Sequence, residues 1–309
     1  MAGTTTKQLL TNLKELTKEY HNGTKSTALK GLKTFKRGIF GQNTVFPAIS
    51  FLPRFEEHTG FRNGGQYKAR RGIDAEIIIK TMNVKDTGKY LQEMCNAYLN
   101  IFYDDNYPNN YRFLNEDNEE TVYNLTAGRT ELNFFTGDRD QVLQRAMIPI
   151  TFSSLEQAPT FVTAKNIVET DVREIGEYTH GILKSSTEMR KAKFFYSHSY
   201  PPIKVGDGVV VSVIENVDER NRREAGRGNP QGQIDILVWT KASPYEGSLD
   251  LNLDTLEEIK TVLQRDQHLG GRCFSTQIER IEYGLNAEAR LYTSRLSFIT
   301  NSWQTLAIE

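Results

Sequence analysis

The sequence contains little that would mark a secreted, membrane-spanning or strongly charged protein. Only 2 of the 309 residues are cysteine, which excludes the disulfide framework that holds many small secreted domains together. No apolar run approaches the roughly 20 residues that a helix needs to cross a bilayer, so we expect no membrane partner. The formal net charge is -1, and the chain as a whole therefore does not attract nucleic acid by bulk electrostatics. Local basic patches remain able to bind.

The short motifs of enzyme chemistry are also missing. Each of the 5 histidines stands alone in sequence, and none belongs to a short metal-binding spacing. The glycines form neither a phosphate-binding loop nor a dinucleotide turn, and no nucleophile elbow is present. We expect no enzyme, no catalytic or metal site and no cofactor. A site assembled from residues distant in sequence stays open as an alternative.

The most informative stretch is a strand followed by a helix at residues 72–103. Residues 72–80 end in an isoleucine run typical of a covered strand. Asp86 is a candidate cap for a helix over residues 86–103. The apolar residues of that helix form one wide stripe: Tyr90, Leu91, Met94, Cys95, Tyr98, Leu99 and Phe102. Such a unit is half of an α+β layer, with the helix lying on the sheet.

The same unit recurs later in the chain. Residues 232–240 are strand-like and share a glycine and an Ile-Asp pair with the first copy. A helix is predicted over residues 254–267, where Asp254 and Glu257 have the spacing of a capping box. The length of the chain fits about two domains.

Each half has the same predicted order, namely helix, strand, arm, strand, helix, strand, strand. In the first half these segments are residues 5–20, 45–53, 56–71, 72–80, 86–103, 121–136 and 141–152. In the second they are residues 169–183, 203–214, 218–230, 232–240, 254–267, 274–283 and 287–300. We interpret this as a duplicated α+β domain, residues 1–153 and 163–309, each a mostly antiparallel sheet packed with helices. Chance similarity of two α+β domains is the alternative.

The segments between these elements are interpreted as linkers. Residues 25–37 form a basic connector, with contact to an acidic partner as the alternative, and lysines 184, 191 and 193 lie in a second linker. Residues 153–163 separate the halves. Cys95 and Cys273 are interpreted as two small buried residues in a reducing compartment.

The two arms are polar, rich in arginine and glycine, and much longer than a tight turn requires. We expect them to project from the sheet as loops that are mobile in the isolated subunit. Because they occupy the same place in both halves, their basic residues are the candidate partner-binding groups: Arg62, Lys68, Arg70, Arg71, Arg220, Arg222, Arg223 and Arg227. Arginine binds carboxylates and phosphates equally well, so these residues leave the kind of partner open.

The order of elements in each half resembles the tail-terminator, or tail-completion, proteins of tailed bacteriophages. The resemblance rests on residues 45–52, 72–80, 86–103 and the strands to Phe152, with counterparts at 203–214, 232–240, 254–267 and the strands to Thr300. It implies helices packed on a sheet with long loops, and a hexameric ring that caps the tail tube and joins it to the head. The implied location is the virion tail or neck, after assembly in the host cytoplasm.

The resemblance also implies the partners. They are other copies of the chain, the tail tube and sheath proteins, the neck or connector proteins, and packaged DNA. Family members are typically single domains, whereas this chain has two. Either three chains form a pseudo-sixfold ring, or six chains carry the second domain as an outer layer. The alternatives are a baseplate or tube-associated adaptor and, from another class, a nucleic-acid-binding module that uses the basic arms. Binding to phosphates would weaken steeply with salt.

Overall fold

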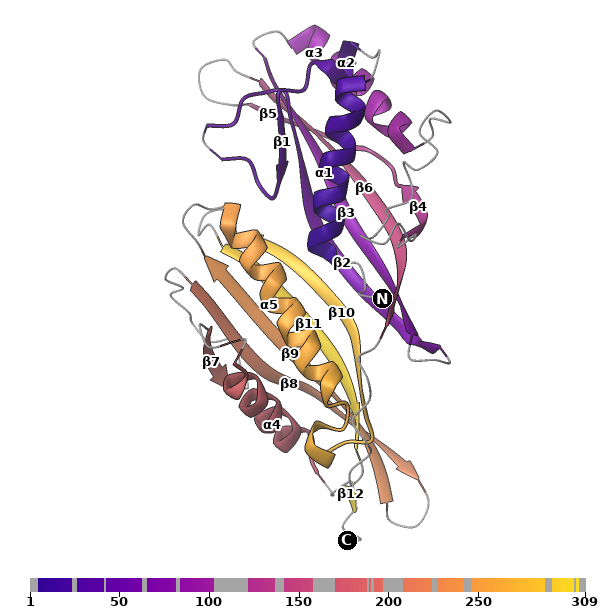
Figure 1. Cartoon of the computed structure of the whole chain (residues 1–309), viewed down its shortest axis with the longest axis vertical. Helices are drawn as coiled ribbons and strands as arrows, with labels where there is room; N and C mark the ends of the chain where they lie inside the picture. Colours follow the sequence, from indigo (N-terminus) through magenta and orange to yellow (C-terminus); the bar gives the residue numbers. More distant parts are fainter. Residues whose placement is uncertain are drawn as a thin grey trace. The chain divides into compact units, whose positions relative to one another are not determined.

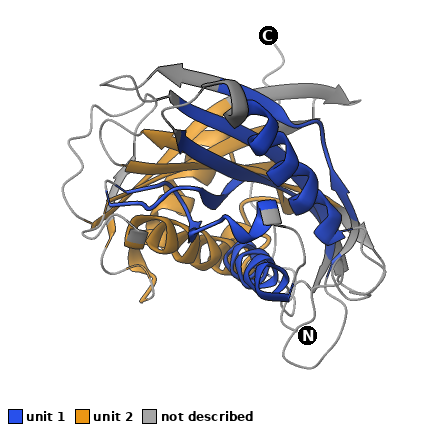
Figure 2. Ribbon diagram, turned by 90° about the horizontal axis from the view of Figure 1, so that it is seen from above, with its two compact units in different colours: residues 1–55, 68–156 blue, residues 56–67, 157–309 orange. Residues whose placement is uncertain are grey.

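The chain forms two compact units, shown in different colours in Figure 2. Unit 1 comprises Met1–Phe55 and Lys68–Glu156, and unit 2 comprises Glu56–Tyr67 and Gln157–Glu309. The computed structural model describes residues 5–23, 27–41, 43–62, 66–81, 84–102, 122–136, 142–157, 170–187, 189, 192–196, 208–223, 227–241, 246–286, 291–302 and 304–305.

Unit 1 combines helices with a sheet (Figure 1). Its elements are α1 (Thr6–Gly23), α2 (Thr27–Lys30), β1 (Thr34–Arg37), β2 (Ala48–Arg62), β3 (Gln66–Thr81), α3 (Val84–Leu99), a 3-10 turn (Asn100–Phe102), β4 (Tyr123–Ala127), β5 (Glu131–Thr136) and β6 (Val142–Gln157). The end of β2 from Glu56 and the start of β3 up to Tyr67 are part of unit 2. The strand order is β1-β2-β3-β6, and β4 and β5 both pair with β6. The pairing of β1 with β2 is parallel, whereas β4 and β5 run antiparallel to β6.

The core of unit 1 lies between its helices and one face of this sheet. On α1, Leu9, Leu10 and Leu13 are fully buried, as the spacing of an apolar helical stripe requires. The ring of Phe51 on β2 lies 6.4 Å from the ring of Tyr98 on α3. Because side chains alternate along a strand, the neighbours of Phe51 point to the opposite face, which we call the outer face of unit 1.

Unit 2 has a similar composition of elements (Figure 1). They are α4 (Val172–Ser185), β7 (Ala192–Tyr196), β8 (Gly208–Arg223), β9 (Arg227–Lys241), α5 (Glu246–Arg265), a 3-10 turn (Leu269–Gly271), β10 (Ser275–Asn286), β11 (Leu291–Asn301) and β12 (Gln304–Thr305). The strand order is β7-β8-β9-β11-β10, with β12 paired to β9. The pairing of β7 with β8 is parallel, and the others are antiparallel.

Both helices of unit 2 pack against the same face of its sheet. The core cluster joins Val172, Ile175 and Leu183 of α4 and Leu256, Ile259 and Leu263 of α5 to alternate strand residues: Val209, Val211, Val213, Ile234, Ile236, Val238, Leu296 and Phe298. The intervening strand residues therefore lie on the outer face of unit 2. At the start of α4, Asp171 accepts a hydrogen bond from the backbone N–H of Glu174 at 2.8 Å, a cap worth about 1 kcal/mol. No helix in the described part of the chain is long and apolar enough to cross a membrane.

The two units share one arrangement of strands. A short strand runs parallel to the first strand of a long hairpin, and the second hairpin strand pairs with the last long strand of the unit. The edge next to that last strand is filled by β10 in unit 2 and by β4 and β5 in unit 1. The prediction of an α+β fold with a mostly antiparallel sheet is confirmed.

Several element predictions were wrong in detail. Strand β1 lies inside the segment interpreted as a basic connector, and β7 lies inside the second linker. Both are short edge strands with basic residues, which hide the alternation of a strand. Helix α5 begins at Glu246, so Asp254 and Glu257 lie within it and form no capping box. The predicted strand over residues 121–136 is two strands, β4 and β5. Strand β6 extends to Gln157, into the predicted linker.

The prediction of loop-like arms was also wrong. Residues 56–62 continue β2, residues 66–71 begin β3, and residues 218–223 and 227–230 belong to β8 and β9. The arms are therefore the outer parts of two long β-hairpins. In β8–β9 the pairing continues from Gly208↔Lys241 to Arg223↔Arg227, with one shift between Glu215 and Val217. Backbone pairing does not need apolar side chains, so these polar strands carried no alternating pattern in the sequence.

Candidate interaction surfaces

The outer parts of the hairpins carry the predicted partner-binding residues. Arg62 ends β2, Arg220, Arg222 and Arg223 lie near the end of β8, and Arg227 begins β9, but the side chains of these five lie outside the described residues. The backbone of Arg222 is paired with that of Gly228. The register of the second hairpin thus places the backbones of these four arginines near the same end of the hairpin.

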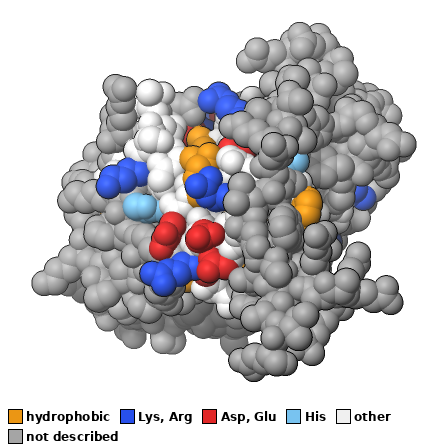
Figure 3. Space-filling view, turned by 90° about the horizontal axis from the view of Figure 1, so that it is seen from below, with side chains coloured by type: hydrophobic (Ala, Val, Ile, Leu, Met, Phe, Trp, Pro, Cys, Tyr) orange, Lys and Arg blue, Asp and Glu red, His pale blue; other side chains and the backbone are white. Residues whose placement is uncertain are grey.

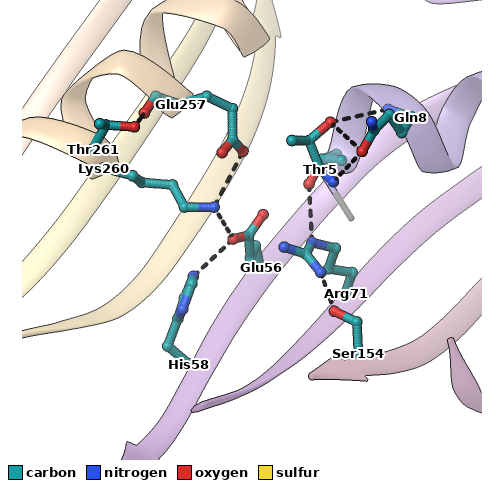
Figure 4. A network of polar contacts seen from close by, with 10 residues as sticks. Thr5, Gln8, Glu56, His58, Arg71, Ser154, Glu257, Lys260 and Thr261 are labelled. Carbon is teal, nitrogen blue, oxygen red and sulfur yellow. Dashed lines mark hydrogen bonds and ion pairs between the residues drawn. The ribbon is translucent and has the colours of Figure 1, made fainter. Parts of the chain in front are cut away.

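Arg71 is not an exposed group, and its assignment to a projecting arm was wrong. Its side chain is 1 % exposed and lies within unit 1. Nε donates a hydrogen bond of 3.2 Å to Thr6 Oγ1 at the start of α1, and Nη1 donates to Ser154 Oγ on β6 (Figure 4). Arg71 therefore connects a helix and two strands of unit 1, which is a structural role.

The neighbouring basic residues of the first hairpin are placed differently. Arg70 is exposed, and its guanidinium carbon lies 5.6 Å from the centre of the Phe55 ring. At this distance the two side chains form a cation–π contact. Lys68 is half-buried. Of the first-hairpin candidates whose side chains are described, Arg70 is the one best placed to meet a partner.

On the outer face of unit 1, a buried carboxylate is held by residues from the strands on both sides. Glu76 on β3 is 5 % exposed, accepts a hydrogen bond of 3.2 Å from Ser50 Oγ on β2, and forms an ion pair with Arg145 on β6. Burial raises the pKa of Glu76, while Arg145 and Ser50 act in the opposite direction. Burial also raises the pKa of the nearby Asp74, whose side chain lies 4.0 Å from Arg54.

Unit 2 has a corresponding arrangement on its outer face. Asp235 on β9 is 2 % exposed and accepts a hydrogen bond of 2.6 Å from Arg295 Nε on β11. Ser297 Oγ, also on β11, donates to the other carboxylate oxygen at 2.6 Å. Asn216 on β8 and Gln233 donate as well.

In both units, then, a carboxylate on the second hairpin strand is bound by an arginine from the last long strand and by a polar donor from the first hairpin strand. A carboxylate whose lone pairs are engaged in this way has little capacity left for a ligand. We call this arrangement, in which an arginine and a polar donor from the flanking strands bind one carboxylate, a carboxylate–arginine clasp. Sequence reasoning missed it, although an acidic residue inside an apolar strand run was the available signal.

A third polar cluster lies within unit 2 and includes the end of β2. Glu56, fully buried, accepts a hydrogen bond of 2.8 Å from Lys260 Nζ on α5, and His58 Nε2 lies 2.7 Å from the same oxygen (Figure 4). Lys260 Nζ also donates to Glu257 Oε1 at 3.1 Å. The prediction placed Glu56 and His58 in a solvated arm, and their burial corrects it.

The described residues on the face drawn in Figure 3 are mixed in charge. Figure 3 shows Asp and Glu side chains beside Lys and Arg on the face that it draws, without a uniformly basic area among the residues described. Among the described residues, the large apolar side chains that are exposed are those of Val45, Leu132, Phe274 and Leu285.

No reactive or metal-binding group emerges from the described residues. They contain no cluster of three or more His, Cys, Asp or Glu that could hold a metal ion. The two thiols are buried, as predicted, and burial raises the pKa of both Cys95 and Cys273 to about 12. A thiol with such a pKa is almost entirely protonated at neutral pH and is a poor nucleophile.

Comparisons with known proteins identify no family. No family model matches the chain, and no curated protein matches it either.

Proposed function

We propose that this chain is a structural protein of a tailed-phage virion, a ring-forming tail terminator or neck component that caps the tail tube and joins it to the head. The observation that carries the proposal is the repeated strand arrangement: β1-β2-β3-β6 in unit 1 and β7-β8-β9-β11 in unit 2. We attribute this repetition to internal duplication of one domain.

A duplicated domain is suited to a ring around a sixfold tail. Closed rings need heterologous contacts, in which each surface meets a different surface of the next member. A chain with two similar units supplies two similar ring positions, so three chains would occupy six. The hairpins, which have the same place in both units, would then present six near-equivalent contacts to the tube or to the neck.

Surface charge favours a protein partner over nucleic acid. Binding to a phosphate backbone requires a basic patch or stripe, whereas the described residues on the face drawn in Figure 3 carry both signs. The net charge of -1 points in the same direction. Interfaces between virion proteins are compatible with such mixed surfaces, because complementary charges set register and specificity.

The mass of the protein in solution tests this function. Native mass spectrometry over a range of concentrations should show three or six copies, and negative-stain images should show rings with sixfold or pseudo-sixfold symmetry. A chain that stays monomeric at every concentration and is absent from purified tails and necks would overturn the proposal. Steep loss of DNA binding with salt, without rings, would favour the nucleic-acid alternative instead.

A further inference from the structure

The two long hairpins differ in what lies along their outer edge. We define this edge as the side of β2 or β8 that faces away from its hairpin partner. In β2, residues 48–51 pair with β1, and β2 is also a hydrogen-bonded neighbour of β10. In β8, residues 209–213 pair with β7, and no strand in the described part of the chain pairs with this edge beyond Val213.

Glu56–Tyr67 of the first hairpin belongs to unit 2, as does β10. Glu57 Oε1 lies 3.8 Å from Arg280 Nη1 on β10, which fixes an acidic residue of the hairpin opposite a basic residue of the edge strand. The corresponding position on β8 is Asp218: it precedes Arg223, the last residue of β8, by as many positions as Glu57 precedes Arg62, the last residue of β2. The second hairpin therefore repeats the acidic residue of the first.

The counterpart of β10 in unit 1 is the pair β4–β5. Both strands run antiparallel to β6, as β10 runs antiparallel to β11. Between them, Gly128 N donates to Pro149 O at 2.7 Å, so residues 128–130 stay alongside β6. The exposed Arg129 lies in this connection. In the strand order β4 is an end strand, and β5 pairs only with β6, so this edge also has no described neighbour.

We propose that the outer edge of β8, residues 216–223, pairs with the β4–β5 edge of a second copy of this chain, and so repeats between molecules the pairing that β2 makes with β10. Neither edge pairs with another strand in the described part of the chain, and a strand edge without a partner presents rows of N–H and C=O groups that readily accept another strand. The contact joins two different surfaces, and repetition of such a contact generates a ring or a filament. The inference rests on the proposed ring and specifies its contact between chains.

Amide hydrogen exchange tests the pairing directly in the wild-type chain. Exchange should be measured on dilute, dissociated protein and on concentrated, assembled protein. On assembly, the amides that point to the outer edges, about every second one in residues 216–223, 123–127 and 131–136, should slow by about tenfold or more, since each new strand pairing must open before exchange. The amides of residues 209–213 lie between β7 and β9 in both states and serve as the internal control.

A charge exchange between Arg129 and Asp218 tests the proposed register. Arg129→Glu alone and Asp218→Arg alone should each raise the concentration needed for half-assembly by about tenfold, because several such contacts act together in a ring. The double variant should return to within about threefold of the wild type. Lys80→Glu makes the same change of charge at an exposed position of β3 and should have no effect.

The possible outcomes distinguish failure of the proposed strand pairing from failure of the proposed ring. Rings that form without slower exchange at both edges would overturn the proposed pairing and leave the proposed function standing. Failure of the double variant to recover, with slower exchange in the wild type, would overturn the register that pairs Arg129 with Asp218. Absence of any assembly would overturn both the pairing and the ring.

Discussion

Units 1 and 2 have the same strand arrangement but differ in how exposed the residues on the outer face of the sheet are. In unit 2 several outer-face residues of β8 and β9 are buried, among them Ser212 at 0 % and Ile214 at 4 % exposed. In unit 1 the outer face is more open, and Arg54 there has a side chain that is 58 % exposed. The edge strands differ as well, because β10 is continuous whereas β4 and β5 are separate.

This comparison shows which features are kept when the same topology is built from two sequences. The helix-facing sides of both sheets are apolar, since each must bury a helix stripe. A carboxylate–arginine clasp occurs in both units, but at positions that are not equivalent, because Asp235 corresponds to Asp74 in the shared Ile-Asp pair whereas unit 1 uses Glu76. The solvent exposure of the outer-face side chains can differ between the units because it depends on what contacts that face. The strand arrangement does not determine it.

The largest loss of folding stability is expected when the buried ion pair of unit 2 is broken. Lys260→Met removes a partner of the fully buried Glu56, and breaking a buried pair costs about 3–5 kcal/mol. We expect unit 2 to unfold at lower denaturant than unit 1. Thiol labelling, mapped by mass, measures this because Cys273 reports on unit 2 and Cys95 on unit 1.

The matched control is Lys89→Met in unit 1. Lys89 Nζ lies 3.9 Å from Glu93 Oε1, but the lysine side chain is 83 % exposed. Exposed pairs of this kind contribute about 0.3–0.5 kcal/mol, so labelling of Cys95 should hardly change. Equal destabilisation by the two substitutions would show that the Glu56–Lys260 contact is not a buried pair.

The next largest difference in stability is expected between substitutions of two adjacent arginines on β3. Arg71→Ala removes hydrogen bonds to Thr6 and Ser154 and leaves a cavity, and we expect unit 1 to lose about 3 kcal/mol. Arg70→Ala, at an exposed position, should change stability by about 0.5 kcal/mol or less. Urea unfolding followed by labelling of Cys95 distinguishes them. Similar midpoints for the two variants would contradict the burial of Arg71.

Much of the fold could be predicted from apolar periodicity. The helix stripes of α1, α3 and α4 and the isoleucine- and valine-rich strands were identified from sequence, because burial imposes their spacing. The shared Ile-Asp pair also has a structural basis: Ile73 and Ile234 are fully buried, and Asp74 and Asp235 follow them on the outer face.

What escaped prediction depends on contacts between distant residues. The shared glycines serve different purposes: a Cβ at Gly72 would meet the Phe55 ring at 2.4 Å, whereas one at Gly232 would meet Val172 of α4 at 2.5 Å. In the sequence nothing distinguishes Arg71 from its exposed neighbour Arg70. The difference comes from the hydrogen bonds that Arg71 makes to Thr6 and Ser154 in the folded chain. The hairpin strands were missed because polar residues on both faces carry no period-2 signal.

A smaller effect is expected from pH at the clasp of unit 1. Burial raises the pKa of Glu76 in the folded state above its unfolded value, so folding favours the protonated form. That contribution is fully present below the unfolded pKa, near 4.5, and is lost as pH rises through the folded pKa. Glu76→Gln keeps a neutral side chain and should therefore gain stability relative to the wild type as pH rises above 4.5. Urea midpoints at several pH values measure the difference, and a constant difference across this range would contradict the raised pKa.

The smallest effect on stability, and the most direct test of function, concerns the ends of the hairpins. The variant Arg70→Ala, Arg222→Ala, Arg223→Ala omits the buried Arg71 and should unfold within about 0.5 kcal/mol of the wild type per substitution if all three arginines are exposed. If the hairpins meet the tube or neck at six near-equivalent points, weak contacts of about 0.2–1 kcal/mol each add up, and the variant should attach poorly to tails. A second variant with lysines at the same three positions keeps the charge but loses the guanidinium fork. Recovery of attachment by lysine would indicate simple charge attraction, and continued loss would indicate bidentate binding to carboxylates. Normal attachment of both variants would exclude the hairpin ends from the interface and leave the contacts elsewhere in the two units.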